Sequence, residues 1–259
     1  MKIQIPKTIH YIWLGGNEKT ELILRCIKSW SETNPDFEII EWNEMNYDTT
    51  KHPQIKRALE AKNYAYASDI MRVDILNEYG GVYLDTDMEL IKPLGKIINR
   101  DICLSYESKY WFGTAIIAGV RNHPMFEFIL KRYDHEKEIN FKTNYLTVHS
   151  FTAYMRYVYN FKPNNKLTVI DNIVLLPKDY FYPIDYMSFK KKITDNTIGI
   201  HHYGGSWHNL KQQKGYRFSS RAKKIIGAKL FLIFEKLFAY TTYRKLKKEF
   251  NQIRKDSNG

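Results

Sequence analysis

Residues 65–87, with the sequence AYASDIMRVDILNEYGGVYLDTD, constrain the fold of this chain more than any other segment. A helix-like stretch ends at Gly80-Gly81, and a short run of strand formers then leads to Asp85 and Asp87. Side chains two residues apart on an extended chain leave the same face, so the two carboxylates point the same way. Open α/β sheets bind ligands at the carboxyl ends of their strands. The segment therefore predicts that the two carboxylates bind a divalent metal ion, which in turn binds a phosphate group of a ligand.

The Asp-x-Asp triplet alone is weak evidence, because about one is expected by chance in a chain of this size. Its context, a helix stop followed by a short strand, adds the weight. Two further charged residues, Asp69 and Arg72, stand three apart on the expected helix. Taken alone, they predict a surface ion pair, which contributes little to stability.

Strand-like and helix-like segments alternate along the rest of the chain. We expect helices over residues 18–31, 52–62, 65–79, 124–133 and 151–158, and strands over residues 9–12, 37–42, 82–84, 102–106, 114–118, 169–176 and 198–203. This alternation predicts a layered α/β domain, in which helices cover the faces of a sheet.

The composition fits a single enzyme domain. The 259 residues can bury one sizeable core, and no linker rich in proline, serine or glycine divides them. The two cysteines, Cys26 and Cys103, cannot build a disulfide framework, and no charged and then apolar leader opens the chain. We therefore expect a cytoplasmic protein in which both thiols are buried packing residues.

Three separated motifs resemble those of one known family. They are IPKTIHYIWLGG at residues 5–16, the segment 65–87, and HHYGGSW at residues 201–207, in the order found in family 32 glycosyltransferases. The chain is similar also to the catalytic domains of large clostridial glucosylating toxins. The resemblance covers roughly residues 3–210. It implies the GT-A nucleotide-sugar fold, a Rossmann-like mixed sheet flanked by helices, and sugar transfer with retention of anomeric configuration.

The resemblance also implies a metal site. Asp87 matches the principal metal ligand, Asp85 contacts the metal and the ribose, and His202 completes the shell, with His201 as the alternative. Carboxylate oxygens suit Mn²⁺ or Mg²⁺, and one imidazole ligand favours Mn²⁺. A bound cation would stabilise the charge that develops on the departing diphosphate.

Six residues match positions that bind the donor in the resembling families: Trp13, Tyr83, Asp69, Arg72, Ser206 and Trp207. Trp13 stacks on the base, unless it is a core residue, and Tyr83 lines the nucleotide pocket. Asp69 and Arg72 bind sugar hydroxyls and orient the phosphate, and with Asp85 and Asp87 they form the implied catalytic set. Ser206 and Trp207 hold the diphosphate, for which an indole N–H is a suitable donor.

Two departures leave the acceptor and the donor hexose open. The segment Thr147-Val148-His149 stands where the family often has Thr-Gly-Pro, and the loop at residues 111–114 lacks an asparagine often found near the donor hexose. A UDP-sugar is favoured, with a GDP-mannose-dependent mannosyltransferase and a toxin-like protein glycosyltransferase as alternatives. No residue is assigned as a covalent nucleophile, because that role needs a carboxylate on the far face of the sugar.

The positive charge of the chain is concentrated after residue 220. Residues 221–259 hold 11 lysines and arginines against 3 acids, which is +8 of the overall +12. An interrupted apolar stretch precedes the cluster Arg244-Lys245-Leu246-Lys247-Lys248 and is too broken to span a membrane. We expect a GT-A catalytic domain over residues 1–220 and a basic amphipathic helical tail over 221–259 that binds anionic lipid. The alternative is a helix that packs on the core of the enzyme.

The favoured hypothesis is a transferase that adds a hexose to a lipid-linked glycan of a surface polysaccharide, at the inner face of the cell membrane. Its partners are then a nucleotide sugar, the glycan acceptor and the membrane. A nucleotidyltransferase is a further enzymatic alternative, and a basic membrane-binding module is the non-enzymatic one. Basic and aromatic residues do not interleave along one stripe, which argues against a nucleic-acid partner.

Overall fold

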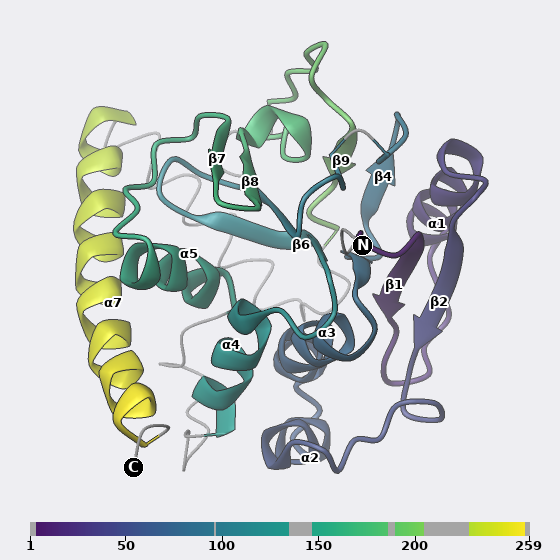
Figure 1. Cartoon of the computed structure of the whole chain (residues 1–259). Coiled ribbons are helices and arrows are strands. Elements are labelled where there is room, and N and C mark those ends of the chain that lie inside the picture. The colour runs from purple at the N-terminus through teal and green to yellow at the C-terminus, as the bar shows by residue number, and fades with distance from the viewer. Residues whose placement is uncertain (1–3, 96, 135–146, 186–189, 205–227, 257–259) are drawn as a thin grey trace.

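A computed structural model of the chain describes residues 4–95, 97–134, 147–185, 190–204 and 228–256. Its centre is a mixed seven-stranded sheet in the order β2-β1-β3-β6-β5-β8-β7 (Figure 1). The strands are β1 (Thr8–Ile12), β2 (Glu38–Trp42), β3 (Gly81–Leu84), β5 (Ile102–Tyr106), β6 (Phe112–Gly119), β7 (Thr168–Ile170) and β8 (Ile173–Leu176). β1 runs parallel to β2 and β3, whereas β6 runs antiparallel to both β3 and β5.

Helices cover the sheet, and a small second sheet stands beside it. The helices are α1 (Glu21–Thr33), α2 (Pro53–Glu60), α3 (Tyr64–Tyr79), α4 (Pro124–Asp134), α5 (Thr147–Val158) and α7 (Ala228–Asp256), with a 3₁₀ turn at Lys178–Tyr180. The second sheet pairs β4 (Met88–Leu90) antiparallel with β9 (Gly199–His201). The expected layered α/β fold is confirmed.

The structure corrects the expected late strands. The segment at residues 169–176 is a hairpin of β7 and β8, because Asp171 adopts a positive φ of 50° and turns the chain. The last strand, β9, is shorter than the expected 198–203 and ends at His201. β4 carries only three residues, and such a short strand has no readable alternation in the sequence.

The turn between α3 and β3 needs its two glycines. Gly80 has a φ of +67° and Gly81 a φ of +100°, a region that side chains strongly disfavour. A Cβ on Gly81 would also lie 2.7 Å from the carbonyl oxygen of Thr8 on β1. The double glycine thus lets β3 enter the sheet directly from the end of the helix.

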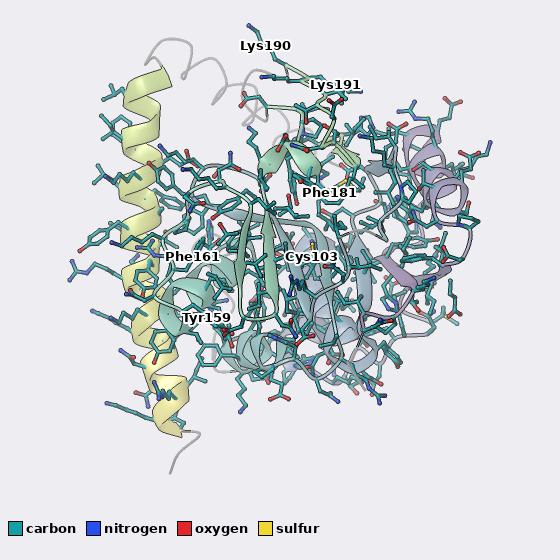
Figure 2. The ribbon with its side chains drawn as sticks, turned by 45° about the horizontal axis from the view of Figure 1, so that its top comes forward. Cys103, Tyr159, Phe161, Phe181, Lys190 and Lys191 are labelled. Atoms are coloured by element: carbon teal, nitrogen blue, oxygen red, sulfur yellow. The ribbon has the colours of Figure 1, made fainter. Side chains whose placement is uncertain are left out.

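Two apolar clusters lie on opposite faces of the sheet, as the alternation of strand side chains requires. Tyr83 of β3 belongs to the cluster that contains residues of α3, α4, α5 and α7. Its neighbours Val82 and Leu84 belong to the other cluster, which contains residues of α1. Both cysteines are buried as expected, and Figure 2 shows Cys103 in the interior of the molecule.

One face of the C-terminal helix α7 is part of the core. Leu246, Phe250 and Ile253 are at most 2% exposed and join the cluster formed with α4 and α5. The buried guanidinium of Arg132 on α4 donates from Nε to Glu249 Oε2 over 3.0 Å. No helix among the described residues is both long enough and apolar enough to cross a bilayer. The boundary at residue 220 stays a prediction, but the alternative of a core-packed helix holds for this face.

A buried histidine at the start of α2 connects this helix to α3 and α4. His52, which caps α2, places Nδ1 3.0 Å from Asp134 Oδ1 at the end of α4 and Nε2 3.4 Å from Asp74 Oδ1 on α3. Asp74 also accepts a hydrogen bond of 2.7 Å from the hydroxyl of Tyr47. Burial opposes protonation of His52, but the hydrogen bonds and charges of the two carboxylates outweigh it and raise its pKa to about 9.

Raising the pH should therefore remove a stabilising contribution of His52. In the unfolded chain its pKa is about 6.5, so the contribution is fully present below that pH and is lost as the pH rises through about 9. The shift corresponds to about 3 kcal/mol. In urea unfolding, wild type should exceed His52→Gln by that much more at about pH 6 than at about pH 10. The same difference at both pH values would contradict this role.

Candidate active site

The site forms where the chain leaves β3 and turns into β4. Because β1 and β3 are parallel, their carboxyl ends reach the same edge of the sheet, with Trp13 after β1 and Asp85 after β3. The amide of Asp85 donates to the Ala115 carbonyl over 2.9 Å, which keeps it in line with β6. A tight turn then leads into β4, whose first residue pairs with His201 of β9. The second sheet therefore brings a late histidine to the paired aspartates.

Asp85, Asp87 and His201 form a compact cluster. One ligand atom of each residue lies within 4.8 Å of the other two, and no other such cluster of three is found among the described residues. His201 Nε2 lies 3.2 Å from Asp87 Oδ1 and 4.0 Å from Asp85 Oδ2. The second oxygen of Asp87 accepts a 2.7 Å hydrogen bond from the amide of Gly204.

The histidine of this cluster is His201, the alternative to the His202 that the resemblance implies as the metal ligand. Adjacent residues at the end of a strand point to opposite sides, so only one of the two can face Asp87. His202 places its Nε2 2.7 Å from Glu89 Oε2, away from the aspartate pair. The cluster thus contains the alternative ligand, and His202 belongs to a separate histidine–carboxylate pair.

Charge couples the members of the cluster. Burial opposes ionisation of Asp87, but the charge and hydrogen bond of His201 and the amide of Gly204 together lower its pKa to about 2. Burial likewise opposes protonation of His201, but the charges of Asp87 and Asp85 raise its pKa to about 9. A cation would thus replace the proton of His201.

The donor set fits a divalent cation. Two carboxylates and one imidazole suit Mn²⁺ and, less well, Mg²⁺, and the three groups lie within 4.8 Å of one another. When bound, such an ion would supply charge stabilisation to a departing diphosphate. Tyr203 adopts a left-handed conformation with a φ of +53°, which costs energy for a residue other than glycine. This conformation turns the chain after β9, and the amide of Gly204 can then donate to Asp87.

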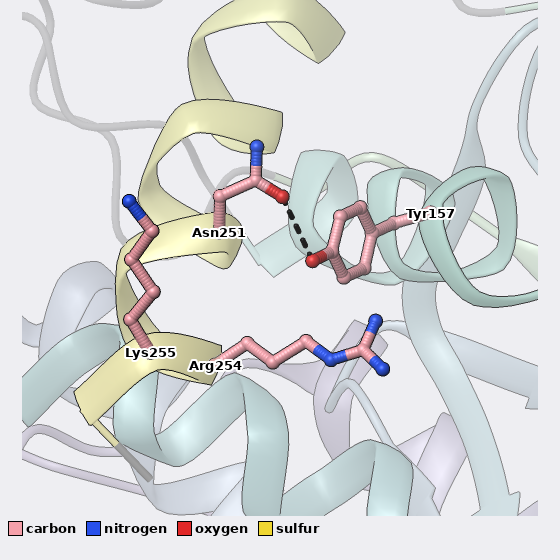
Figure 3. Close-up of a pocket in the computed structure, with 4 residues that line it drawn as sticks. All are labelled: Tyr157, Asn251, Arg254 and Lys255. Carbon is pink, nitrogen blue, oxygen red and sulfur yellow. Dashed lines mark hydrogen bonds between the residues drawn. The ribbon is translucent and has the colours of Figure 1, made fainter. Parts of the chain in front are cut away.

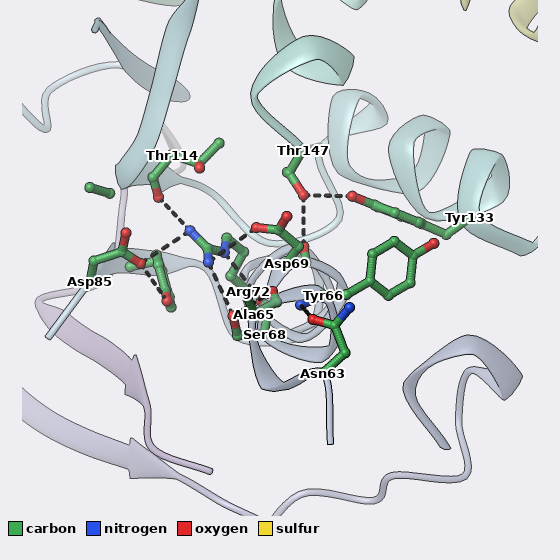
Figure 4. Close-up of polar contacts among 12 residues, drawn as sticks. Asn63, Ala65, Tyr66, Ser68, Asp69, Arg72, Asp85, Thr114, Tyr133 and Thr147 are labelled. Atoms are coloured by element: carbon green, nitrogen blue, oxygen red, sulfur yellow. Dashed lines mark hydrogen bonds and ion pairs between the residues drawn. The ribbon is translucent and has the colours of Figure 1, made fainter. Parts of the chain in front are cut away.

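Arg72 is the centre of a buried network beside this cluster (Figure 4). Its NH1 donates to Asp85 Oδ1 over 3.1 Å and to the Thr114 carbonyl over 2.9 Å. Its NH2 lies 3.1 Å from Asp69 Oδ1 and 3.3 Å from Ser68 Oγ, and its Nε donates to the Ser68 carbonyl over 3.2 Å. These five contacts match the five N–H donors of a guanidinium. Arg72 therefore positions both Asp69 and Asp85.

The interpretation of Asp69 and Arg72 as a surface ion pair is wrong. Asp69 is 8% exposed and Arg72 is 5% exposed, and both lie on a helix that is buried on all sides from Tyr66 to Leu76. Burial raises the pKa of Asp69, and the charge of Arg72 opposes that rise. The carbonyl of Asp69 also accepts a 3.1 Å hydrogen bond from Thr147 Oγ1, at the start of α5.

Tyr83 and Trp13 are at the same edge but are mostly covered. The hydroxyl of Tyr83 donates to Asp85 Oδ1 over 2.9 Å, and Arg72 lies over its ring at 4.6 Å from the centroid. Trp13 is 8% exposed, and its indole N–H donates to the Asn17 carbonyl over 2.8 Å. Lys19 lies 5.5 Å from the Trp13 ring centroid. The roles of both rings in nucleotide binding stay predictions, as do those of Ser206 and Trp207, which lie outside the described residues.

The structure adds one acid that the sequence interpretation missed. Glu107 follows β5 and lies near Tyr203 and His201, close enough for these groups to influence its pKa. Burial raises the pKa of Glu107, and the charge of His201 opposes the rise. A single glutamate after a strand is not a recognisable motif. Its position near the cluster is clear only once β4 pairs with β9 and brings His201 beside the end of β5.

Comparison with known proteins identifies the family. A family model described as a glycosyltransferase sugar-binding region containing a DXD motif matches residues 20–104. An uncharacterized glycosyltransferase of Acanthamoeba polyphaga mimivirus is 30% identical over 192 residues, which cover 67% of this chain and 73% of that protein. The chain belongs to the DXD glycosyltransferases. The matched region contains α3, both glycines and both aspartates, which form one of the three motifs that led to the family, and the family expectation is confirmed.

Two further relatives of this DXD glycosyltransferase bear on the fold and the length. Inositol phosphoceramide mannosyltransferase 2 of Schizosaccharomyces pombe is 25% identical over 215 residues, which cover 79% of this chain but 59% of that protein. The solved PaToxG glycosyltransferase has a TM-score of 0.50 at 20% identity, over 60% of this chain and 69% of that one. This likeness shows the fold alone, and the expected GT-A fold is confirmed.

Proposed function

We propose that this chain is a metal-dependent hexosyltransferase that moves a sugar from a nucleotide donor to a glycan acceptor with retention of configuration. The observation that carries the proposal is the cluster of Asp85, Asp87 and His201 at the carboxyl edge of the sheet, next to the buried pair Asp69 and Arg72. Membership of the DXD glycosyltransferases supports transfer, and the resemblance in the sequence supports retention.

In this proposal each residue of the site has a defined task. Asp87 is ionised at neutral pH and holds the cation, with Asp85 and His201 as the other ligands. Arg72 holds Asp85 and Asp69 in place, so that the Asp69 carboxylate can accept hydrogen bonds from donor-sugar hydroxyls. A rigid, buried set of this kind supplies its electrostatic stabilisation without reorganising during the reaction.

The donor and the acceptor are proposed by class. We favour a UDP-sugar, with GDP-mannose as the first alternative because the fission-yeast relative is named a mannosyltransferase. The name of that relative also refers to a ceramide lipid, and this supports a lipid-linked acceptor. We place the enzyme at the inner face of the cell membrane, with Mn²⁺ as its cation.

Hydrolysis of nucleotide sugars in the absence of acceptor tests this function. With a panel of UDP- and GDP-sugars, we expect at least one donor to release free sugar and nucleoside diphosphate in Mn²⁺. Chelation with EDTA should stop the release, and fresh Mn²⁺ should restore it. Preference for GDP-mannose would select the mannosyltransferase, and release of a sugar phosphate would select the nucleotidyltransferase. A folded protein that hydrolyses and binds no donor would contradict the proposal and favour a binding module.

A further inference from the structure

The helix α7 has an outward face that the described residues leave about half exposed. Its first turns carry six large apolar or aromatic side chains that are 46–55% exposed: Leu230, Ile233, Phe234, Leu237, Phe238 and Tyr240. We call these six residues the apolar row. Figure 2 shows α7 standing at one side of the molecule, with side chains that project away from the domain. Scattered single apolar residues on a surface are ordinary, but a contiguous row marks an interaction site.

The same outward face becomes basic farther along the helix. Arg244, Lys245, Lys247 and Lys248 are all exposed, whereas Leu246 between them is buried in the core. The whole of α7 has eight lysines and arginines against three acids. A protein partner would need a complementary groove for this pattern, whereas an anionic bilayer offers apolar chains and negative headgroups along one plane.

A shallow pocket extends the basic end of the face. It is lined by Tyr157 of α5 and by Asn251, Arg254 and Lys255 of α7, and the Tyr157 hydroxyl donates to Asn251 Oδ1 over 2.9 Å (Figure 3). Two more cations are thus available for headgroup phosphates. We assign no separate ligand to this pocket.

The apolar row lies at the end of α7 that packs against the β5–β6 loop and the first turn of α5. The ring of Phe238 lies 6.1 Å from that of Trp111 and 5.7 Å from that of His149, and Trp111 and His149 are 4.5 Å apart. Trp111 belongs to the β5–β6 loop that carries Glu107, and His149 follows Thr147, which contacts Asp69. Two short, packed segments therefore join the row to Glu107 and Asp69 beside the site.

We propose that the outward face of α7 docks flat on an anionic membrane, with the apolar row inserted among the lipids and the basic half against the headgroups. Docking in this orientation brings the end of α7 beside Trp111 and His149 to the membrane surface. A lipid-linked acceptor could then reach the site without leaving the bilayer. This last step rests on the proposed function, whereas the docking itself does not.

Two matched substitutions test the docking surface. Leu237 is 55% exposed on α7, and Leu24 is 54% exposed on α1, which lies on the opposite side of the molecule (Figure 1). Wild type should sediment with vesicles of phosphatidylcholine and phosphatidylserine, and added salt should weaken the binding. Leu237→Glu should weaken it at least tenfold, because it places a negative charge among anionic lipids. Leu24→Glu should stay within twofold of wild type.

Circular dichroism and donor hydrolysis separate docking from other effects. Leu237→Glu should keep the wild-type spectrum and the wild-type rate of donor hydrolysis, because the Leu237 side chain is 55% exposed and is not part of the core or of the site. If the wild-type protein does not sediment with the vesicles, or if Leu237→Glu and Leu24→Glu bind the vesicles equally well, the docking proposal is overturned. A wild-type dimer that Leu237→Glu dissociates, in a protein that binds no vesicles, would assign the row to a second copy of the chain. Vesicle binding without hydrolysis of any donor would instead remove the proposed function and leave the docking in place.

Discussion

Asp87→Asn should abolish metal-stimulated donor hydrolysis while the protein stays folded. The substitution keeps the shape of the side chain but removes the negative charge, which Asp87 carries at neutral pH because its pKa is about 2. Loss of a charged metal ligand and of the electrostatic stabilisation it supports should cost about 3 kcal/mol or more, which is a rate reduction of at least about 100-fold. We would measure hydrolysis over a range of Mn²⁺ concentrations together with circular dichroism.

The neighbouring histidine–carboxylate pair supplies a matched control. Glu89 lies on β4 and His202 directly follows β9, and their contact of 2.7 Å resembles that between Asp87 and His201. Glu89→Gln therefore makes the same chemical change two residues away and should leave hydrolysis within about threefold of wild type. Equal losses in Asp87→Asn and Glu89→Gln, or a folded Asp87→Asn protein within tenfold of wild type, would sink the assignment of the metal site.

The choice between the two histidines shows where sequence reasoning ends for this site. The pattern of α3, the two glycines and β3 follows from local rules, because helix periodicity and the positive φ of Gly80 and Gly81 depend on neighbouring residues. Which of His201 and His202 faces Asp87 depends on the register of β9 against β4, over 100 residues earlier in the chain. A shift of one residue would exchange their places. No local pattern contains that information.

The C-terminal helix likewise shows that the sequence predicts the helix but not which of its faces packs on the core. Its composition predicted a basic amphipathic helix, and the structure contains a helix over residues 228–256. The sequence alone left open whether its apolar residues face a membrane or the core. The helix has both core-facing and exposed apolar residues: Leu246 and Phe250 are fully buried, whereas Phe234 and Leu237 are about half exposed. The position of α4 and α5 beside the second half of α7 decides this division, and Glu107 was missed for a similar reason.

Arg72→Ala should destabilise the fold by about 3 to 5 kcal/mol at neutral pH. Arg72 is 5% exposed and satisfies Asp69, Asp85 and the carbonyl of Thr114, so its removal leaves the buried carboxylate of Asp69 and the partly buried carboxylate of Asp85 without their cation. Breaking a buried ion pair by deleting one partner costs that much, because the remaining charge is uncompensated. Urea unfolding followed by circular dichroism would measure the loss.

An exposed ion pair on another helix calibrates this result. Lys28 Nζ lies 3.2 Å from Glu32 Oε1 on α1, and both side chains are at least 60% exposed. Lys28→Ala should therefore change the free energy of unfolding by less than about 0.5 kcal/mol. Arg72→Lys should fall between the two variants, because an ammonium keeps the charge but cannot reproduce the planar five-donor arrangement. If Arg72→Ala costs no more than Lys28→Ala, then Arg72 does not hold the site together, and Asp69 and Asp85 must owe their positions to the backbone of α3 and β3.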